Sequence, residues 1–203
     1  MRLRQHVNPL GIGFVDLRAA PPQLPAGREL EVEIGCAEAD FLFDRAAAVP
    51  DHQFIGLDVR QGMVDLVNHR AAAIGAPVQA LFCNANLHLR RLLPAGRVSR
   101  VFLNFPDPWF KMRHRKRRLI DEALVRDIHR ASVPGAEVFV QTDVWSIALD
   151  AMGVLDRLDD LFDNRAGAWS FWKQGNPYGA TSGRERACTR EGKPIWRLLY
   201  LTR

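Results

Sequence analysis

Residues 105–118, FPDPWFKMRHRKRR, contain the side chains whose types and spacing are most informative about chemistry. Asp107 stands between Pro106 and Pro108, and Trp109 follows at once. The two prolines restrict the backbone on both sides of the carboxylate, and the indole ring offers a flat wall. A fixed polar group beside such a wall is suited to hold a planar, nitrogen-containing ring in one orientation. The segment therefore predicts a small binding site for a flat ring.

Two other interpretations of this segment have to be weighed. Asn104, directly before it, could supply the polar atom in place of Asp107. The segment could also be an ordinary turn at the end of a strand, with Trp109 in the core. Two prolines around one aspartate restrict the chain more than such a turn requires, and this favours the binding site.

A dense cationic run follows the aspartate. Its positive charges are not interrupted by Asp or Glu and belong to Lys111, Arg113, Arg115, Lys116, Arg117 and Arg118, with His114 among them. The chain has 28 Lys and Arg against 23 Asp and Glu, so without these six the balance is 22 against 23, or −1. Such a concentrated excess predicts a site for a polyanion, and nucleic acid is the natural partner.

The alternative is that the run is a solvated surface or a targeting tag. Tags tend to lie at termini or in polar linkers. Here an apolar strand candidate at residues 101–105 precedes the run, and a helix candidate that starts near Asp121 follows it. The run therefore belongs to a folded domain, which favours phosphate binding.

Length and composition predict one domain over residues 1–203, with residues 1–29 as an N-terminal extension packed on or near it. The chain is 47% hydrophobic, enough for one substantial core, and has no linker rich in Pro, Gly or Ser. The three cysteines show no CxxC spacing and the six histidines no HxxxH or HExxH pattern, so neither a disulfide framework nor a metal site is expected.

The N-terminal sequence MRLRQHVNPL lacks the apolar core of a signal peptide. No stretch reaches the roughly 18 apolar residues of a membrane span. A soluble, cytoplasmic protein without a membrane partner is expected.

Short apolar runs alternate with longer segments of helical period, which predicts an α/β fold with a doubly wound, mostly parallel sheet. The expected strands are residues 30–34, 54–57, 78–83, 101–105 and 137–142. The expected crossover helices are residues 61–74, with Val64, Val67, Ala71 and Ile74 on one face, and residues 121–132. A polar loop at residues 174–189 and a strand at residues 195–201 predict an antiparallel C-terminal edge.

Polar residues end the expected strands: Glu33, Asp58, Asn84, Asp107 and Asp143. Ligands of a doubly wound sheet bind outside the carboxyl ends of its strands, near the point where the strand order reverses. Gly35 permits a tight backbone approach there. Asp58, 23 residues further on, could take both hydroxyls of a ribose, and Asn84 could bind an adenine edge.

Each of these residues alone is more often a helix cap, but three at regular βα spacing predict an adenosine-containing ligand. Both NAD and S-adenosylmethionine place an adenosine in this position. The sequence GCAEA after the first strand has one glycine and no GxGxxG fingerprint. A pyrophosphate would be poorly bound, so a cofactor without one is favoured.

Together these motifs resemble the tRNA (guanine-N7-)-methyltransferase family. The resemblance rests on FPDPWFKMRHRKRR and extends through EIG at Glu33, GLDVR at Gly56, CNAN at Cys83, QTDV at Gln141 and GRER at Gly183, covering most of the chain. RQHVNPL and the phenylalanine after DPW are similar to one branch of that family. The resemblance implies a Rossmann-like class I methyltransferase, S-adenosyl-L-methionine as cofactor, and N7-methylguanosine in the variable loop of tRNA as product.

The resemblance also implies roles for individual residues. The cofactor pocket would comprise Glu33, Gly35, Asp58, Asn84 and Ala85, with Asp107 between cofactor and base as the catalytic residue. The substrate nucleotide would contact Lys111, Asp143, Ser182, Gly183, Arg184 and Glu185. The RNA would be held by Arg113, His114, Arg115, Lys116, Arg117 and Arg118. The partner would be tRNA, and the protein a monomer or homodimer.

The chemistry of guanine limits what such a site has to do. N7 carries an in-plane lone pair and no proton, so methyl transfer from a sulfonium needs no general base. Alignment helps, and so does a carboxylate that offsets the positive charge developing on the purine. Asp107 is suited to that role, and Asp143 to the guanine N1–H and N2 edge.

The chain departs from the family at a few positions. Ala39 stands where the family usually has glycine, which would cost about 1 kcal/mol at positive φ, and Asp40 after it could crowd or repel the methionine end of the cofactor. Thr181 and Ser182 both offer the hydroxyl of the family's threonine, and the stretch before Glu33 is short. A rival hypothesis is therefore a catalytically weak or silent tRNA-binding paralogue. An NAD-linked oxidoreductase is disfavoured by the missing glycine fingerprint.

Overall fold

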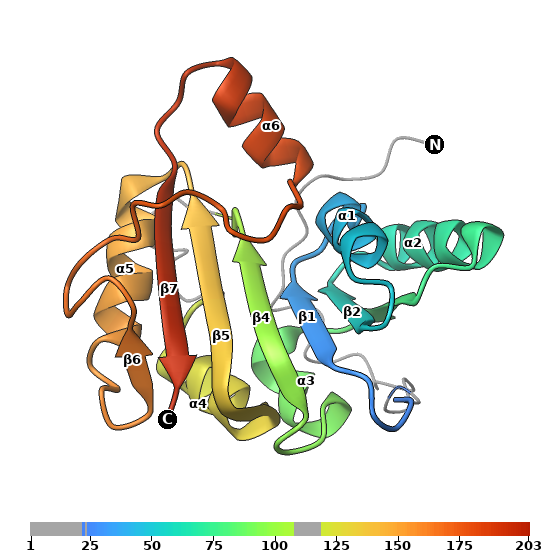
Figure 1. Ribbon diagram of the computed structural model, residues 1–203, viewed down its shortest axis with the longest axis horizontal. Helices are drawn as coiled ribbons and strands as arrows, with labels where there is room; N and C mark the ends of the chain where they lie inside the picture. Colours follow the sequence, from blue (N-terminus) through green and yellow to red (C-terminus); the bar gives the residue numbers. More distant parts are fainter. Residues whose placement is uncertain (1–21, 23, 108–118) are drawn as a thin grey trace.

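The computed structural model describes residues 22, 24–107 and 119–203, in which strands and helices alternate along most of the chain (Figure 1). The strands are β1 Leu30–Ile34, β2 Gln53–Asp58, β3 Val78–Phe82, β4 Val98–Asn104, β5 Ser132–Thr142, β6 Phe162–Asn164 and β7 Trp196–Thr202. The helices are α1 Asp40–Ala48, α2 Gln61–Ile74, α3 Ala85–Leu92, α4 Glu122–Ala131, α5 Trp145–Leu155 and α6 Gly183–Arg190.

These strands form a seven-stranded sheet in the order β3-β2-β1-β4-β5-β7-β6. β1 to β5 run parallel, whereas β7 pairs antiparallel with both β5 and β6. The chain winds from β1 to β3 on one side and from β4 outward on the other, so the strand order reverses between β1 and β4. The predicted doubly wound sheet is confirmed. The predicted antiparallel strand at residues 195–201 corresponds to β7, and the short strand β6 beside it was not predicted.

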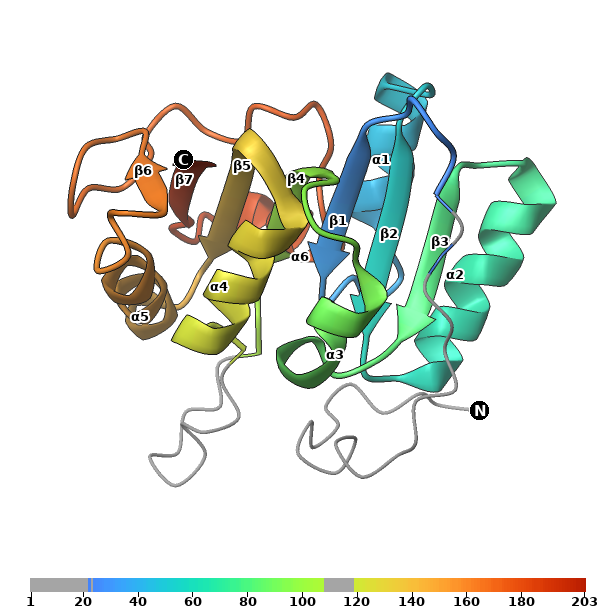
Figure 2. The ribbon, with the colours of Figure 1, turned by 90° about the horizontal axis from the view of Figure 1, so that it is seen from below.

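Helices cover both faces of this sheet (Figure 2). α3, α4 and α5 cover one face and share one apolar core with Leu30, Val32 and Ile34 of β1. α1 and α2 pack on the other, where the rings of Phe102 and Tyr178 meet edge to face with centroids 4.9 Å apart. Strands buried on both faces read as continuous apolar runs, which is why most were visible in the sequence.

Two local predictions were wrong. Ile74 was placed on the core face of α2, but its side chain is 65% exposed because the buried face of that helix ends at Ala71. Residues 174–189 were predicted as a polar loop, but the second half of that segment belongs to α6. The hydroxyl oxygen of Ser182 caps α6 by accepting a hydrogen bond from the Glu185 amide at 3.1 Å.

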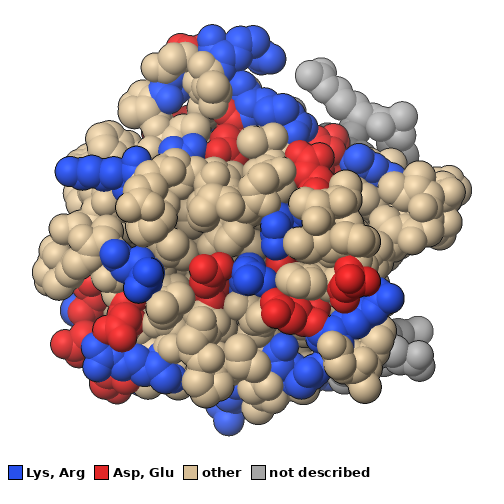
Figure 3. Space-filling model, in the orientation of Figure 1, with Lys and Arg blue, Asp and Glu red and all other residues tan. Residues whose placement is uncertain are grey.

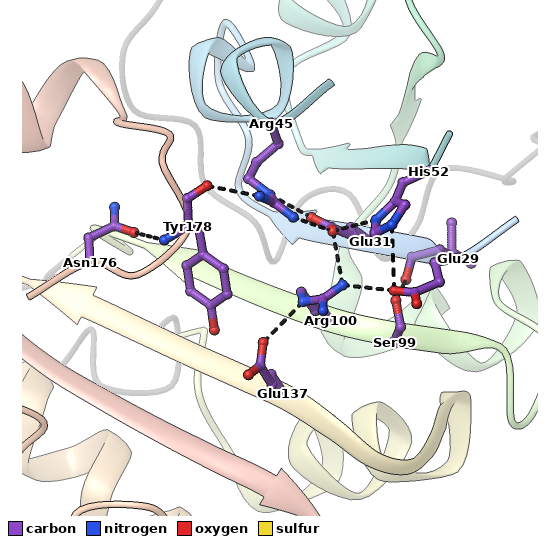
Figure 4. A network of polar contacts seen from close by, with 10 residues as sticks. Glu29, Glu31, Arg45, His52, Ser99, Arg100, Glu137, Asn176 and Tyr178 are labelled. Carbon is purple, nitrogen blue, oxygen red and sulfur yellow. Dashed lines mark hydrogen bonds and ion pairs between the residues drawn. The ribbon is translucent and has the colours of Figure 1, made fainter. Parts of the chain in front are cut away.

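A buried network of charges fastens α1 to the sheet (Figure 4). Glu31 on β1 is fully buried and accepts hydrogen bonds of 2.9 and 2.6 Å from Arg45 of α1. Arg100 of β4 lies 3.2 Å and His52 Nδ1 2.8 Å from the same carboxylate. Arg45 also donates to the carbonyl of Tyr178 at 2.8 Å. A buried charge is stable only when paired, so this network holds α1 and the segment around Tyr178 on one face of the sheet.

Among the residues that the structure describes, no helix is long and apolar enough to cross a membrane. The same residues contain no group of three or more His, Cys, Asp or Glu side chains that could hold a metal ion. Cys36, Cys83 and Cys188 are free and buried.

Candidate functional site

A cavity of about 670 Å³ opens at the carboxyl ends of β1 to β5, where the strand order reverses. Its lining includes all of the predicted cofactor-binding residues, Glu33, Gly35, Asp58, Asn84, Ala85 and Asp107. It also includes four of the predicted substrate residues, Asp143, Ser182, Gly183 and Arg184. The structure thus brings together residues that the sequence places on separate strand ends.

The loop after β1 turns sharply because Gly35, Ala37 and Ala39 adopt left-handed conformations, with φ of 82°, 50° and 54°. Three hydrogen bonds attach this loop to β2, one of them from the Cys36 amide to the carbonyl of Leu57 at 3.2 Å. The Gly35 amide donates to the carbonyl of Leu57 at 2.7 Å, and the Ala37 amide to Asp58 Oδ2 at 2.9 Å. The predicted strain at Ala39 is confirmed, since a non-glycine residue in this region costs about 1 kcal/mol.

Asp40 does not stand in this cavity as an unpaired charge. Its carboxylate pairs with Arg70 of α2 at 3.0 Å and with Arg186 of α6 at 2.6 Å. Two guanidinium groups offset the repulsion that the sequence suggested toward the cofactor. The pair with Arg186 also connects α1 to α6 across the mouth of the cavity.

Glu33 is the most unusual group of the site. The side chain is buried, and its Oε1 accepts a hydrogen bond of 2.7 Å from Asn104 Nδ2. Its Oε2 is buried without a hydrogen-bond partner among the described residues. Burial raises the pKa of Glu33 to about 8, against the lowering effect of the Asn104 hydrogen bond. An unpartnered carboxylate oxygen beside a cavity fits the ammonium group of an amino-acid ligand.

Asp58 is buried at the end of β2 and is held by its neighbours. Its Oδ1 accepts from the backbone amide and from Nε of Arg60, at 2.9 and 2.8 Å, and Arg60 also donates to Oδ2 at 2.8 Å. This pairing fixes the carboxylate at the cavity wall. Ribose hydroxyls would therefore share this group with Arg60, a residue that sequence reasoning missed.

Asn84 caps a helix, which is the most frequent role of a polar residue directly after a strand. Its Oδ1 accepts from the amide of Asn86 at 3.1 Å and so caps α3. The side chain of Asn84 is buried while the residue lines the cavity, as does Ala85. The first turn of α3 therefore borders the ligand space, with Ala85 and Asn86 in the cavity lining.

The end of β4 delivers the predicted catalytic residue. Phe105 has φ of 52°, and its amide donates to the carbonyl of Gln141 at 2.7 Å. This bend directs Pro106 and the exposed Asp107 along the cavity. A left-handed residue before a proline is costly, and such strain tends to lie at functional sites.

α6 brings the predicted substrate segment to the same cavity. Arg184 forms an ion pair with Asp143 after β5. Ser182, and not Thr181, lines the cavity, which favours Ser182 for the family's hydroxyl role. Lys and Arg side chains gather over α6 in the space-filling view (Figure 3), and they include Arg184 and Arg186.

Glu185 lies below this segment instead of facing the cavity. The side chain is buried and accepts hydrogen bonds from Gln141, Asn176 and Arg197, each at 2.9 Å. A carboxylate with three partners has little left to offer a nucleotide. Its predicted contact with the substrate stays a prediction.

The cationic run lies outside the described residues. This holds for Lys111, Arg113, His114, Arg115, Lys116, Arg117 and Arg118, and for Trp109. Besides Arg60, sequence reasoning missed Gln141 and Arg197. Polar residues within otherwise apolar strands were the available signal in the sequence.

The fold and the site together define a class I S-adenosylmethionine-dependent methyltransferase. Solved structures of this class share the fold. One is the 16S rRNA methyltransferase KamB, with a TM-score of 0.59, 16% identity, and coverage of 86% of this chain and 87% of that one. Another is an S-adenosylmethionine-dependent methyltransferase from Aquifex aeolicus, with a TM-score of 0.56, 12% identity, and coverage of 86% and 83%.

Sequence comparison narrows the class to a family. Residues 28–198 match the family model described as "Putative methyltransferase". A tRNA (guanine-N(7)-)-methyltransferase of Synechococcus sp. (strain WH7803) is 38% identical over 98% of this chain and 86% of its own length. That of Nostoc sp. (strain PCC 7120) is 33% identical over 98% and 94%. The chain belongs to the tRNA (guanine-N(7)-)-methyltransferase family.

Proposed function

We propose that the protein transfers a methyl group from S-adenosylmethionine to N7 of a guanosine in the variable loop of tRNA. The observation that carries this proposal is similarity over nearly the full chain to relatives of that name, at 36 to 38% identity for two of them. The cavity is consistent with it, because the predicted cofactor residues line one wall and the substrate segment another.

The residues present fit the cofactor. S-adenosylmethionine, when bound, supplies the sulfonium methyl group. Glu33 would hold its ammonium group with Oε2, which has no partner among the described residues, and Asp58 with the residues at the start of α3 would hold the adenosine. The left-handed loop from Gly35 to Ala39 would follow the methionine moiety.

The catalytic role falls to alignment and charge, because guanine N7 has no proton to remove. Asp107 would lie next to the purine and offset the positive charge that develops on it. Asp143, oriented by Arg184, would accept from the N1–H and N2 amino edge of guanine. Ser182 and Gly183 would contact the nucleotide from the start of α6.

The remaining proposals concern tRNA binding, domain organisation, location in the cell and oligomeric state. We propose that Lys111 and Arg113 to Arg118 bind tRNA phosphates, supplemented by the arginines of α6. We propose further that residues 1–203 form one methyltransferase domain with residues 1–29 as an N-terminal extension, and that it acts in the cytoplasm as a monomer or homodimer.

Methyl transfer to defined tRNA transcripts tests the reaction. The enzyme, S-adenosylmethionine and tRNA should yield N7-methylguanosine on nucleoside analysis. A matched transcript with 7-deazaguanosine in place of guanosine should accept no methyl group, because the nucleophilic nitrogen is missing. Methylation of the deaza transcript would place the reaction at another atom.

Asp107→Asn tests the catalytic assignment. It should lower the single-turnover rate by about 10- to 1000-fold, since the carboxylate acts on charge present only in the transition state. tRNA affinity should stay within a few-fold. An unchanged rate with a large loss of tRNA affinity would make Asp107 a binding residue instead.

The silent-paralogue hypothesis predicts tRNA binding without cofactor binding. This hypothesis was based on Ala39 and on the charge of Asp40. Because Asp40 pairs with two arginines, the argument from its charge no longer supports the hypothesis, and the argument from Ala39 remains. Calorimetry with S-adenosylhomocysteine separates the two hypotheses. Binding supports the enzyme, and its absence together with intact tRNA binding supports the paralogue.

A further inference from the structure

A row of polar side chains, of which all but the half-buried Arg197 are buried, crosses four neighbouring strands directly below the cavity. Glu33 lies on β1, Asn104 on β4, Gln141 on β5 and Arg197 on β7. Asn104 is paired with Gln141 in the sheet register, and Gln141 with Arg197. Paired residues on adjacent strands point to the same face, so the register itself creates this row.

Hydrogen bonds join the row into one chain. Arg197 Nε donates to Gln141 Oε1 at 3.2 Å, and Gln141 Nε2 donates to Asn104 Oδ1 at 2.9 Å. Asn104 Nδ2 then donates to Glu33 Oε1 at 2.7 Å. Gln141 also branches, because its Nε2 donates to Glu185 Oε2 of α6 at 2.9 Å.

The direction of every bond in this chain follows from its Arg197 end. A guanidinium only donates, so Gln141 accepts with its oxygen and donates with its nitrogen to Asn104 Oδ1, which turns the N–H group of Asn104 toward Glu33. Gln141 is completely buried and uses both of its N–H groups and its oxygen. Without it, nothing in the row would prevent Asn104 from turning its oxygen toward Glu33.

We propose that Gln141 is a positioning residue that holds the cofactor-facing carboxylate and the substrate-facing helix in register through one side chain. One branch orients Asn104, which leaves Glu33 Oε2 directed at the ligand. The other branch anchors Glu185 and thereby the N-terminal half of α6, which carries Ser182 to Arg184 to the cavity. This inference rests on the proposed function for the identity of the ligands, but the geometry of the two branches does not depend on it.

Gln141→Met tests both branches at once, since methionine is similar in length and volume and makes none of the three hydrogen bonds. The matched control is Ser132→Ala. Ser132 is a buried polar residue at the other end of β5, and its hydroxyl donates to the carbonyl of Ile128 at 2.8 Å. Both variants remove buried hydrogen bonds from one strand, so each is expected to lose stability.

Two measurements on the folded protein separate positioning from stability. In Gln141→Met, the Kd of S-adenosylhomocysteine should rise about tenfold by calorimetry, and amides of α6 should exchange hydrogen about tenfold faster. In Ser132→Ala, both quantities should stay within about twofold of the parent. The proposal would be overturned if Ser132→Ala changed either quantity tenfold. It would also be overturned if Gln141→Met changed only the Kd or only the hydrogen exchange of α6.

A milder variant covers the case in which Gln141→Met does not fold. Arg197→Lys retains a positive charge for Glu185 but has no Nε–H to fix the oxygen of Gln141. It should weaken S-adenosylhomocysteine binding by about threefold, and unchanged affinity would count against the proposal. Failure of the parent to bind S-adenosylhomocysteine would instead contradict the proposed function, while hydrogen exchange of α6 would still test the second branch.

Discussion

Glu33 is buried at the wall of the cavity, with one oxygen bonded to Asn104 and the other without a partner among the residues that the structure describes. Desolvation raises its pKa to about 8. In the ligand-free protein such a carboxyl group is protonated over most of the neutral range. A bound ammonium group would favour the ionised form, so ligand binding would release a proton from Glu33.

Glu33→Gln should remove a pH dependence of stability. The folded-state pKa of about 8 lies above the ordinary value of 4.5, so between these values the folded protein holds a proton that the unfolded chain has released. The stability from this group is complete below about pH 4.5 and is lost as the pH rises toward about 8. The variant should therefore gain stability over the parent between about pH 5 and about pH 8, by at most about 5 kcal/mol, in urea denaturation.

A ligand provides the control for this experiment. Saturating S-adenosylhomocysteine should reduce the difference between parent and variant, because its ammonium group pairs with the ionised carboxylate. The same variant should bind S-adenosylhomocysteine about tenfold more weakly. Stability curves that stay parallel across the whole pH range would show that Glu33 does not titrate in this interval.

At the scale of elements, the loop after β1 depends on a close contact with β2. A Cβ atom added at Gly56 would lie 2.6 Å from Sγ and 3.0 Å from Cβ of Cys36. Cys36 belongs to the loop whose left-handed residues line the cavity. The glycine on β2 thus sets the distance between strand and loop.

Gly56→Ala should destabilise the protein by about 1 to 3 kcal/mol and weaken cofactor binding, because the loop has to shift to relieve the contact. Gly153→Ala on α5 is the matched control. An added Cβ there meets only the far end of the Arg157 side chain at 3.4 Å, and alanine in a helix interior is favoured by about 0.5 to 1 kcal/mol. Thermal unfolding and calorimetry measure both effects. Parent-like values for Gly56→Ala would mean that the loop position is not limited by this contact.

The elements that the sequence predicted share a clear hydrophobic period. α2 coincides with the predicted residues 61–74 because Val64, Val67 and Ala71 repeat on one face and Gly75 ends the helix at φ 65°. α6 was missed because it buries only Glu185 and Cys188, so no apolar stripe marks it. β6 has three residues, too few to show any period.

In the candidate site, the residues at the strand ends could be predicted from the sequence, but their hydrogen-bond partners could not. Parallel strands all end at one edge of the sheet, so a list of strand ends already contains Glu33, Asp58 and Asn84. The partners of those residues depend on which strands become neighbours and in what register. The bond from Asn104 to Glu33 joins strands far apart in the sequence, and no local pattern encodes it.

For the whole molecule, the excess of positive charge is concentrated in one segment of the sequence. On the face that Figure 3 shows, Asp and Glu are interspersed among Lys and Arg. The net charge of +5 falls to −1 without the six cations of residues 111–118. Attraction to tRNA should therefore come mainly from this one segment.

Replacement of Arg115 and Lys116 by alanine should weaken tRNA binding at low salt. Each phosphate contact contributes about 0.7 to 0.9 to the slope of log K against log salt, so the slope should flatten by roughly 1.4 to 1.8. Affinity for S-adenosylhomocysteine should not change, and this serves as the control for folding. A double variant with the parent's affinity and slope would show that these two side chains do not contact phosphate.

The position of β7 has a consequence for how the protein is made. β7 comes after every other strand of the described sheet in the chain, yet it is inserted between β5 and β6. On the ribosome, β1 to β5 are synthesised before β7, so the edge of β5 that later pairs with β7 is at first unpaired. β6 is also unpaired until then, because its partner in the sheet is β7. An open edge is a template for strands of other chains. The interval between synthesis of β5 and of β7 is therefore when we expect a nascent chain to be most exposed to aggregation.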